Sequence, residues 1–194
     1  MARLKAPQRR EQLLEVAAQL FADRGYDSTT TAAIAESAGV TEPILDRHFK
    51  SKQDLFIAIV RRMSEQTLNQ WRAVIADIPD PAEQIRTIAQ QFPEQLKNLK
   101  VAYQVLHGAL ATSRDRKVVA VVTEHYTRVH AFFADIIRQG QATGRLRRDL
   151  NPNVPAWGFI YTGIGYAMTA LKLDGFDEMD VEPLIESILG GVYA

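Results

Sequence analysis

The sequence lacks cysteine, so it cannot form a disulfide or a thiolate metal site. Its four histidines include His125 and His130, whose spacing of five residues differs from the i, i+4 spacing of a helical zinc pair. The longest uncharged apolar stretch, residues 156–171, is shorter than the roughly 20 residues that span a bilayer. No basic segment followed by an apolar run opens the chain. We therefore expect a cytoplasmic protein with no membrane partner, metal, cofactor or enzymatic activity.

The chain also has no excess of basic or of acidic residues. Lysine and arginine together number 23, and so do aspartate and glutamate, so the net charge is zero. The overall charge therefore does not favour a nucleic-acid partner. The first ten residues are different, because they contain Arg3, Lys5, Arg9 and Arg10 and no acid. Such a basic arm is suited to contact phosphates, and it is equally compatible with a solvated tail.

A helical period runs through the chain, and no segment shows the alternation of a strand. Hydrophobic residues make up 46% of the 194 residues, which is enough to bury a core. Apolar residues three and four positions apart predict a first helix over residues 8–24, with Gly25 as its stop. The same spacing of apolar residues in the rest of the chain predicts an all-α fold of about nine helices.

Residues 29–50 are predicted to form two short helices joined by a tight turn. Threonines at 29–31 offer hydroxyls that cap the first helix, Gly39 suits the turn, and Thr41 and Pro43 suit the start of the second. In a helix-turn-helix, the second helix enters the major groove of DNA. Spacing alone leaves a DNA-binding motif and an ordinary packing corner equally open.

The residue types in this segment distinguish these two interpretations. Phe-Ala-x-x-Gly-Tyr at 21–26 is followed by Thr29-Thr30, Ile34-Ala35, Ala38-Gly39-Val40, Arg47-His48-Phe49 and Ser51-Lys52-x-Asp54-Leu55. This succession resembles the DNA-binding signature of TetR-family regulators. The close resemblance covers about the first third of the chain, and the remainder resembles the family in helix number, in size and in Gly-x-Leu-Arg-x-Asp at 144–149.

The resemblance implies a DNA-binding transcriptional regulator, expected to be a repressor that a small effector releases from operator DNA. Residues 1–53 are then a three-helix DNA-binding head with the helix-turn-helix at about 29–50. Residues 54–194 are a helical bundle that binds the effector and forms a homodimer. The expected partners are palindromic double-stranded operator DNA, a small and largely apolar effector, and a second copy of the chain.

The family pattern implies which residues contact the DNA backbone. Phosphates are expected to be contacted by Thr29 or Thr30 and by Lys52, since hydroxyl and ammonium groups donate to phosphate oxygens. Arg47 is expected to reach either a phosphate or a guanine. His48 is expected to orient the packing or a backbone contact rather than to read sequence.

The start of the second short helix is expected to face base edges through Thr41, Glu42, Pro43 and Ile44. Short side chains there are able to approach the groove floor and a thymine methyl. Asp46 departs from the family pattern, which usually has tyrosine before Arg-His-Phe. A carboxylate near the phosphates is repelled and offers no donor, so we expect weaker DNA binding rather than a contact to a cytosine amino group.

Aromatic and polar residues of the C-terminal helices are candidates for an apolar effector pocket. They are Met63, Trp71, Phe92, Tyr103, His107, Tyr126, His130, Phe133 and Tyr161. Any one residue of these types is more often part of an ordinary core. The last two predicted helices, residues 154–173 and 181–193, are expected to form the dimer interface, because small residues at 158, 163, 165, 167 and 170 allow close approach.

An alternative remains open from the sequence. A helical ligand-binding or interaction module could retain the helix-turn-helix as a scaffold and have lost DNA binding through Asp46. This alternative predicts that the protein binds an effector and does not bind operator DNA.

Overall fold

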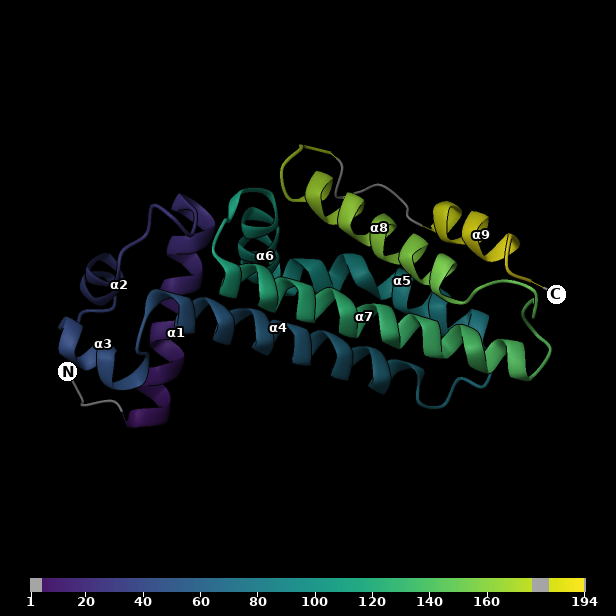
Figure 1. The fold of residues 1–194 in the computed structure, drawn as a ribbon, viewed down its shortest axis with the longest axis horizontal. Coiled ribbons are helices and arrows are strands. Elements are labelled where there is room, and N and C mark those ends of the chain that lie inside the picture. Colours follow the sequence, from purple (N-terminus) through teal and green to yellow (C-terminus); the bar gives the residue numbers. More distant parts are fainter. Residues whose placement is uncertain (1–4, 176–181, 194) are drawn as a thin grey trace. The chain divides into compact units, whose positions relative to one another are not determined.

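The computed structural model describes residues 5–175 and 182–193, and its regular elements there are all helices (Figure 1). The all-α prediction is therefore confirmed. The helices are α1 Ala6–Arg24, α2 Thr31–Ser37, α3 Glu42–His48, α4 Lys52–Ile75, α5 Pro81–Asn98, α6 Lys100–Thr112, α7 Arg116–Ala142, α8 Asn153–Ala170 and α9 Glu182–Gly190. Two expected features lie outside the described residues: Arg3 of the basic arm and residue 181, the expected first residue of the last helix.

Several helix ends follow from local chemistry that the sequence reveals. Gly25 and Gly39 have φ angles of 82° and 66°, which residues with a side chain adopt rarely. Ser51 Oγ accepts from the backbone N–H of Asp54 at 3.2 Å, which satisfies a free donor at the start of α4. Thr41 precedes α3 as expected, but its hydroxyl makes no capping hydrogen bond.

The helices α4 and α9 both end in tight turns. The α4 helix ends at Ile75, before Pro79, and the backbone N–H of Ile78 donates to the Ile75 carbonyl. The last helix ends at Gly190, because the backbone N–H of Gly191 bonds the Ile188 carbonyl in a tighter turn.

The chain divides into two compact units. The first contains Met1–Ser64 and Val101–Thr123, and Phe21, Tyr26 and Phe56 form an aromatic cluster in it with ring centroids 5.2–6.1 Å apart. The expected functional boundary after residue 53 falls within this unit and stays a prediction. Leu13, which is fully buried, belongs to the same unit and comes from the predicted apolar face of α1.

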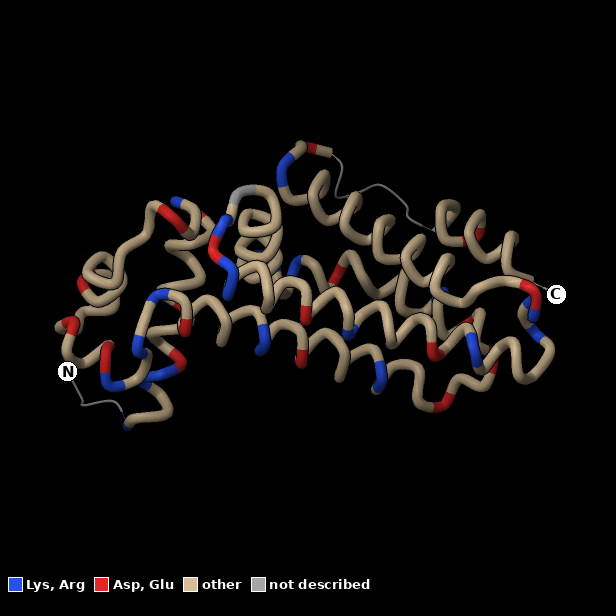
Figure 2. The backbone as a smooth tube through the Cα atoms, in the orientation of Figure 1, with Lys and Arg blue, Asp and Glu red and all other residues tan. Residues whose placement is uncertain are grey.

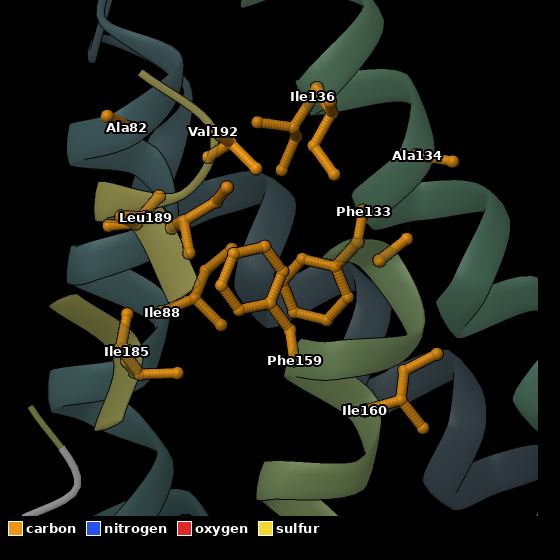
Figure 3. Close-up of a cluster of buried hydrophobic side chains, with 14 of the residues drawn as sticks. Ala82, Ile88, Phe133, Ala134, Ile136, Phe159, Ile160, Ile185, Leu189 and Val192 are labelled. Carbon is orange, nitrogen blue, oxygen red and sulfur yellow. The ribbon is translucent and has the colours of Figure 1, made fainter. Parts of the chain in front are cut away.

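The second unit contains Glu65–Lys100 and Glu124–Ala194 and has a large hydrophobic cluster (Figure 3). Phe133 and Phe159 meet there with ring centroids 5.6 Å apart. The α9 helix is held to α5 by Arg86, which donates from Nε to Glu186 Oε1 at 2.5 Å and also to the Tyr193 hydroxyl. This ion pair lowers the pKa of Glu186.

Candidate nucleic-acid interface and effector region

The α2–α3 corner is built by a few backbone contacts in the first unit. Thr30 caps α2, since its Oγ1 accepts from the Ala33 backbone N–H at 3.1 Å. After the turn at Gly39, the Val40 backbone N–H returns to the Ala35 carbonyl at 2.9 Å. These contacts keep the corner in one conformation, as a helix-turn-helix requires.

The two sides of α3 have different environments. Leu45 is fully buried and Phe49, just after the helix, is 3% exposed, so these two residues anchor α3. The residues before Leu45, 41–44, are all exposed. Ile44 is 37% exposed, so an apolar side chain is accessible on this surface. The four residues expected to face base edges therefore share one accessible surface.

The three expected phosphate-contacting residues are placed differently. Thr29 is 1% exposed, and its hydroxyl donates to the Gly25 carbonyl at 2.8 Å, which leaves Thr30 as the exposed one of the pair. Lys52 Nζ donates to the Tyr26 carbonyl at 2.8 Å and lies 4.3 Å from the Tyr26 ring centroid. The Lys52 ammonium is thus positioned by the fold next to the loop after α1.

Charges of both signs occur along α3 and the start of α4 (Figure 2). Residues 41–55 contain three basic side chains and three acidic ones. Glu42 accepts a hydrogen bond from the Thr31 hydroxyl at 3.2 Å, which ties it to α2. Asp46 and Arg47 are exposed on the same helix, and His48 is half-buried. The acid that departs from the family pattern is therefore on the accessible surface.

The basic arm also approaches α3. The Arg10 guanidinium lies 4.6 Å from the centroid of the Phe49 ring, at the end of α3. Arg9 and Lys5 are part of the described arm as well, and Arg9 donates to Gln12 Oε1. The arm thus adds positive charge beside the C-terminal end of α3.

Asp115 connects three segments of the first unit. Its carboxylate accepts from the backbone N–H of Lys117 at 2.9 Å at the start of α7, and from Gln53 Nε2 in the first turn of α4. The Tyr26 hydroxyl also reaches it, at 3.5 Å. The Gln53 hydrogen bond is the main cause of the lowered pKa of Asp115. Burial, with Asp115 nearby, raises the pKa of Tyr26 to about 12.

The nine expected effector residues fall into three groups. Trp71, Phe92, Tyr126 and Phe133 belong to the large cluster of the second unit or pack against it. Met63, Tyr103 and His107 belong to the first unit and are buried. His130 and Tyr161 both contact Trp157, with ring centroids 4.8 and 5.5 Å from its ring, and Tyr161 is 64% exposed. Tyr161 therefore lies on the protein surface rather than in an interior.

His107 and Gln95 are buried polar residues of the C-terminal helices. His107 lies 5.9 Å from Tyr103 between ring centroids, and burial lowers its pKa to about 4. Gln95 on α5 is 1% exposed and accepts a hydrogen bond from Trp71 Nε1 at 2.8 Å. Sequence reasoning missed Gln95, although its position seven residues after Ile88 and three after Phe92 continues the apolar face of α5.

The second unit also has a surface groove, which is lined by residues other than the expected effector residues. It has a volume of about 450 Å³, and its walls come from α4, α5 and α7. Its lining residues are Leu68, Arg72, Ile75, Gln84, Arg128, Ala131, Phe132, Asp135, Ile136 and Gln139. None of the nine expected effector residues lines it.

The α8 and α9 helices present apolar side chains on their outer side. Val154, Trp157, Tyr161 and Met168 on α8 are 36–69% exposed, and Leu184 on α9 is 50% exposed. The α8 residues follow one another at helical spacing, so they form a single stripe. An accessible apolar stripe of this kind is typical of an interaction surface.

Other site types receive no support from the part of the chain that the structure describes. No group of three or more histidine, aspartate or glutamate side chains is placed there to hold a metal ion. Among the described helices, none is both long enough and apolar enough to cross a membrane.

The sequence comparisons point to one family. Residues 13–59 match the family model described as bacterial regulatory proteins, tetR family. The HTH-type transcriptional repressor KstR2 of Mycolicibacterium smegmatis is 27% identical over 143 residues, which is 74% of this chain and 70% of KstR2. The HTH-type transcriptional activator FasR of the same organism is 31% identical over 104 residues, but the match covers only 48% of FasR.

The structure comparisons extend the likeness to the whole chain. The fatty acid degradation regulator FadR of Bacillus halodurans has a TM-score of 0.82 at 19% identity, covering 97% of this chain and 98% of FadR. The TM-score shows a shared fold, and at 19% identity the likeness shows the fold alone. The matched residues 13–59 include α2, α3 and the start of α4, where the exposed residues described above are located.

Proposed function

The chain belongs to the TetR family of bacterial regulatory proteins and is a DNA-binding transcriptional regulator, and on that basis we propose how its residues perform this function. The exposed surface at residues 41–44, where α3 begins, reads operator bases in the major groove together with Arg47, chiefly through Thr41 and Ile44. The observation that carries this proposal is the contrast within one short helix, where Leu45 is fully buried and the residues before it are exposed. The buried anchor orients the accessible residues.

The proposed base contacts follow from the chemistry of the exposed side chains. Ile44 offers an apolar contact for a thymine methyl, and Thr41 offers a hydroxyl to a base edge or phosphate. Arg47 is able to donate two hydrogen bonds to a guanine base, or two charge-assisted hydrogen bonds to a phosphate. Glu42 is tied to Thr31 and therefore contributes to the position of α3 more than to base reading.

Phosphate contacts are proposed for Thr30, Lys52 and the basic arm. Thr30 is exposed at the start of α2, whereas the hydroxyl of Thr29 is buried and already donates. Lys52 keeps one N–H for a phosphate after its two hydrogen bonds to carbonyls. Asp46 opposes these contacts, because its charge has the same sign as the phosphates.

The proposed assembly is a homodimer through α8 and α9. The support is the exposed apolar stripe on α8 together with Leu184 on α9. A dimer presents two copies of α3, and helix-turn-helix dimers bind half-sites about 34 Å apart. The two half-sites of such an operator are related by the twofold symmetry of the protein, so the operator is expected to be palindromic.

The proposed regulation is release from the operator by a small, largely apolar effector bound in the second unit without chemical conversion. The support is the aromatic group of Trp71, Phe92, Tyr126 and Phe133 at the large cluster. An effector that prefers the conformation unsuited to DNA lowers operator affinity by its differential affinity for the two conformations. Repression is the mode we propose, in the cytoplasm, and KstR2 is a repressor by name.

Binding to the DNA upstream of the chain's own gene tests the proposal. Fluorescence anisotropy would compare that fragment with an unrelated fragment of equal length at physiological salt. We expect preference for the upstream fragment by at least about 1,000-fold, with two chains bound per site. Equal binding to both fragments, with retained binding of apolar compounds, would support the ligand-module alternative instead.

A further inference from the structure

Gln95 has only part of its hydrogen-bonding capacity satisfied. Its Oε1 accepts from Trp71 Nε1 at 2.8 Å, and an indole N–H is solely a donor, so this contact fixes which end of the amide is oxygen. The Nε2 end is then the free end. It is buried and has no hydrogen-bond partner among the described residues.

Thr67 is a second buried polar residue whose hydrogen-bonding capacity is not satisfied. Its side chain is fully buried on α4, and Oγ1 has no hydrogen-bond partner in the described part of the chain. Thr67 precedes Trp71 by four residues, so the two side chains share one face of α4. A threonine within a helix commonly bonds to the carbonyl four residues earlier, and Thr67 does not.

Two unpaired groups close to one tryptophan are unusual, because nearly all buried polar atoms in proteins have a partner. Trp71 links them: it is bonded to Gln95 across the helix pair and lies one turn from Thr67 along α4. Both groups are able to donate to an oxygen. The missing partner is therefore an acceptor.

The surroundings define the rest of the ligand. The Trp71 ring lies 5.6 and 5.4 Å from the rings of Phe132 and Phe133, and Phe92, one turn before Gln95, packs against Tyr166. Among the described residues, no lysine, arginine, aspartate or glutamate is buried. A buried charge without a partner is strongly disfavoured, so an ionic ligand does not suit this interior.

We propose that the effector is a neutral, largely apolar molecule with a carbonyl or similar acceptor oxygen, which Gln95 Nε2 and the Thr67 hydroxyl bind beside Trp71. This inference rests on the effector site proposed above and adds the chemical class of the ligand. It makes Gln95 and Thr67 the residues that determine specificity, in a setting where the aromatic side chains supply apolar contact.

Matched probes test the acceptor directly by fluorine NMR of the full-length protein. The probes are fluorinated acetophenone, benzophenone and fluorenone, each with its matching hydrocarbon and with a carboxylate derivative. We expect at least one ketone to bind about 5- to 10-fold more tightly than its hydrocarbon, since a hydrogen bond to a buried donor has that effect. The carboxylates are expected to bind more weakly than the ketones.

Two variants test whether Thr67 and Gln95 are the residues that bind the ketone oxygen. Thr67→Val removes a hydroxyl that has no partner in the free protein, so the free variant should melt no lower than wild type while ketone affinity falls about 5- to 10-fold. Gln95→Met removes the amide donor and should have the same effect on ketones and little on hydrocarbons. Thr127→Val on α7 and Gln90→Met on α5 change exposed residues of the same types and serve as controls.

Each remaining outcome overturns the inference: no ketone binds, hydrocarbons or carboxylates bind as tightly as ketones, or Thr67→Val and Gln95→Met leave ketone affinity unchanged. Operator binding, measured on the same samples without a probe, reports separately on the proposed function. A protein that binds its operator and shows no preference for ketones would refute the ligand class alone.

Discussion

Gln53 donates a hydrogen bond from Nε2 to Oδ2 of Asp115 at 2.5 Å, which joins the first turn of α4 to the residue that caps α7. The two residues are 62 positions apart in the chain and belong to the same compact unit. Asp115 thereby serves as a helix cap and as a tertiary contact. Its position next to the DNA-binding segment makes it a structural support of the candidate interface.

Asp115→Ala should destabilise the protein by about 1–2 kcal/mol, because the α7 cap and the acceptor for Gln53 are lost together. Urea unfolding at neutral pH measures this change. Asp135→Ala is the matched control, since Asp135 pairs with Arg138 on the surface of one helix and should change stability by under about 0.5 kcal/mol. Equal effects of the two substitutions would contradict the role given to Asp115.

His107 should make stability depend on pH between about 6.5 and 4. Burial lowers the folded-state pKa to about 4, so the unfolded chain binds the proton more readily. Stability from the neutral form is fully present above pH 6.5 and is lost as the pH falls through this window, by at most about 3 kcal/mol. Urea unfolding of wild type and His107→Leu at pH 7.5 and pH 5 isolates this contribution.

The loss on acidification should be smaller in His107→Leu than in wild type, because leucine cannot take up the proton. Carboxylates elsewhere contribute equally to both proteins, so the difference between them is the quantity of interest. Parallel pH profiles would contradict the account of His107.

Asp46→Tyr should bind the upstream DNA fragment about tenfold more tightly than wild type, because a carboxylate near the phosphates is replaced by a hydroxyl donor. Asp46→Asn, which removes the charge alone, should give an intermediate affinity. Anisotropy at two salt concentrations measures both. Weaker binding by the tyrosine variant, with a changed base preference, would show instead that Asp46 reads a base.

Trp157→Glu and Tyr161→Glu should convert the dimer to a monomer, since each places a charge in the apolar stripe of α8. Light scattering coupled to size-exclusion chromatography gives the mass in solution. Leu110→Glu on α6 is the control, because Leu110 is 49% exposed and lies outside α8 and α9. A dimer that persists in both α8 variants would require a different interface.

The sequence predicted the helices well where the signals are local. Asp80 followed by Pro81 is typical of the start of a helix, and Asp80 Oδ1 accepts from the Ala82 backbone N–H at 3.1 Å. Gly39 was expected to turn the chain before α3 and has a positive φ. Such features depend on neighbouring residues only, so a single sequence reveals them.

The burial of the expected effector residues could not be predicted in the same way, because burial depends on distant parts of the chain. Trp71 and Phe133 are buried in one cluster, while Tyr161, equally aromatic and also on a helix, is exposed. Gln95 lies at an apolar-face position of α5, but its hydrogen bond with Trp71 on another helix could not be predicted from that spacing. Pairings of that kind are set by tertiary packing.

Alanine substitutions on α3 test the central claim, that its exposed surface reads the operator. The measurement is the ratio of affinities for the upstream fragment and for an unrelated fragment, by anisotropy, for Thr41→Ala, Ile44→Ala, Arg47→Ala and the control Arg24→Ala. We predict that at least one α3 substitution lowers this ratio about tenfold or more, as loss of a good base contact does, and that exposed Arg24 leaves it unchanged. A ratio unchanged in all three α3 variants would contradict the claim.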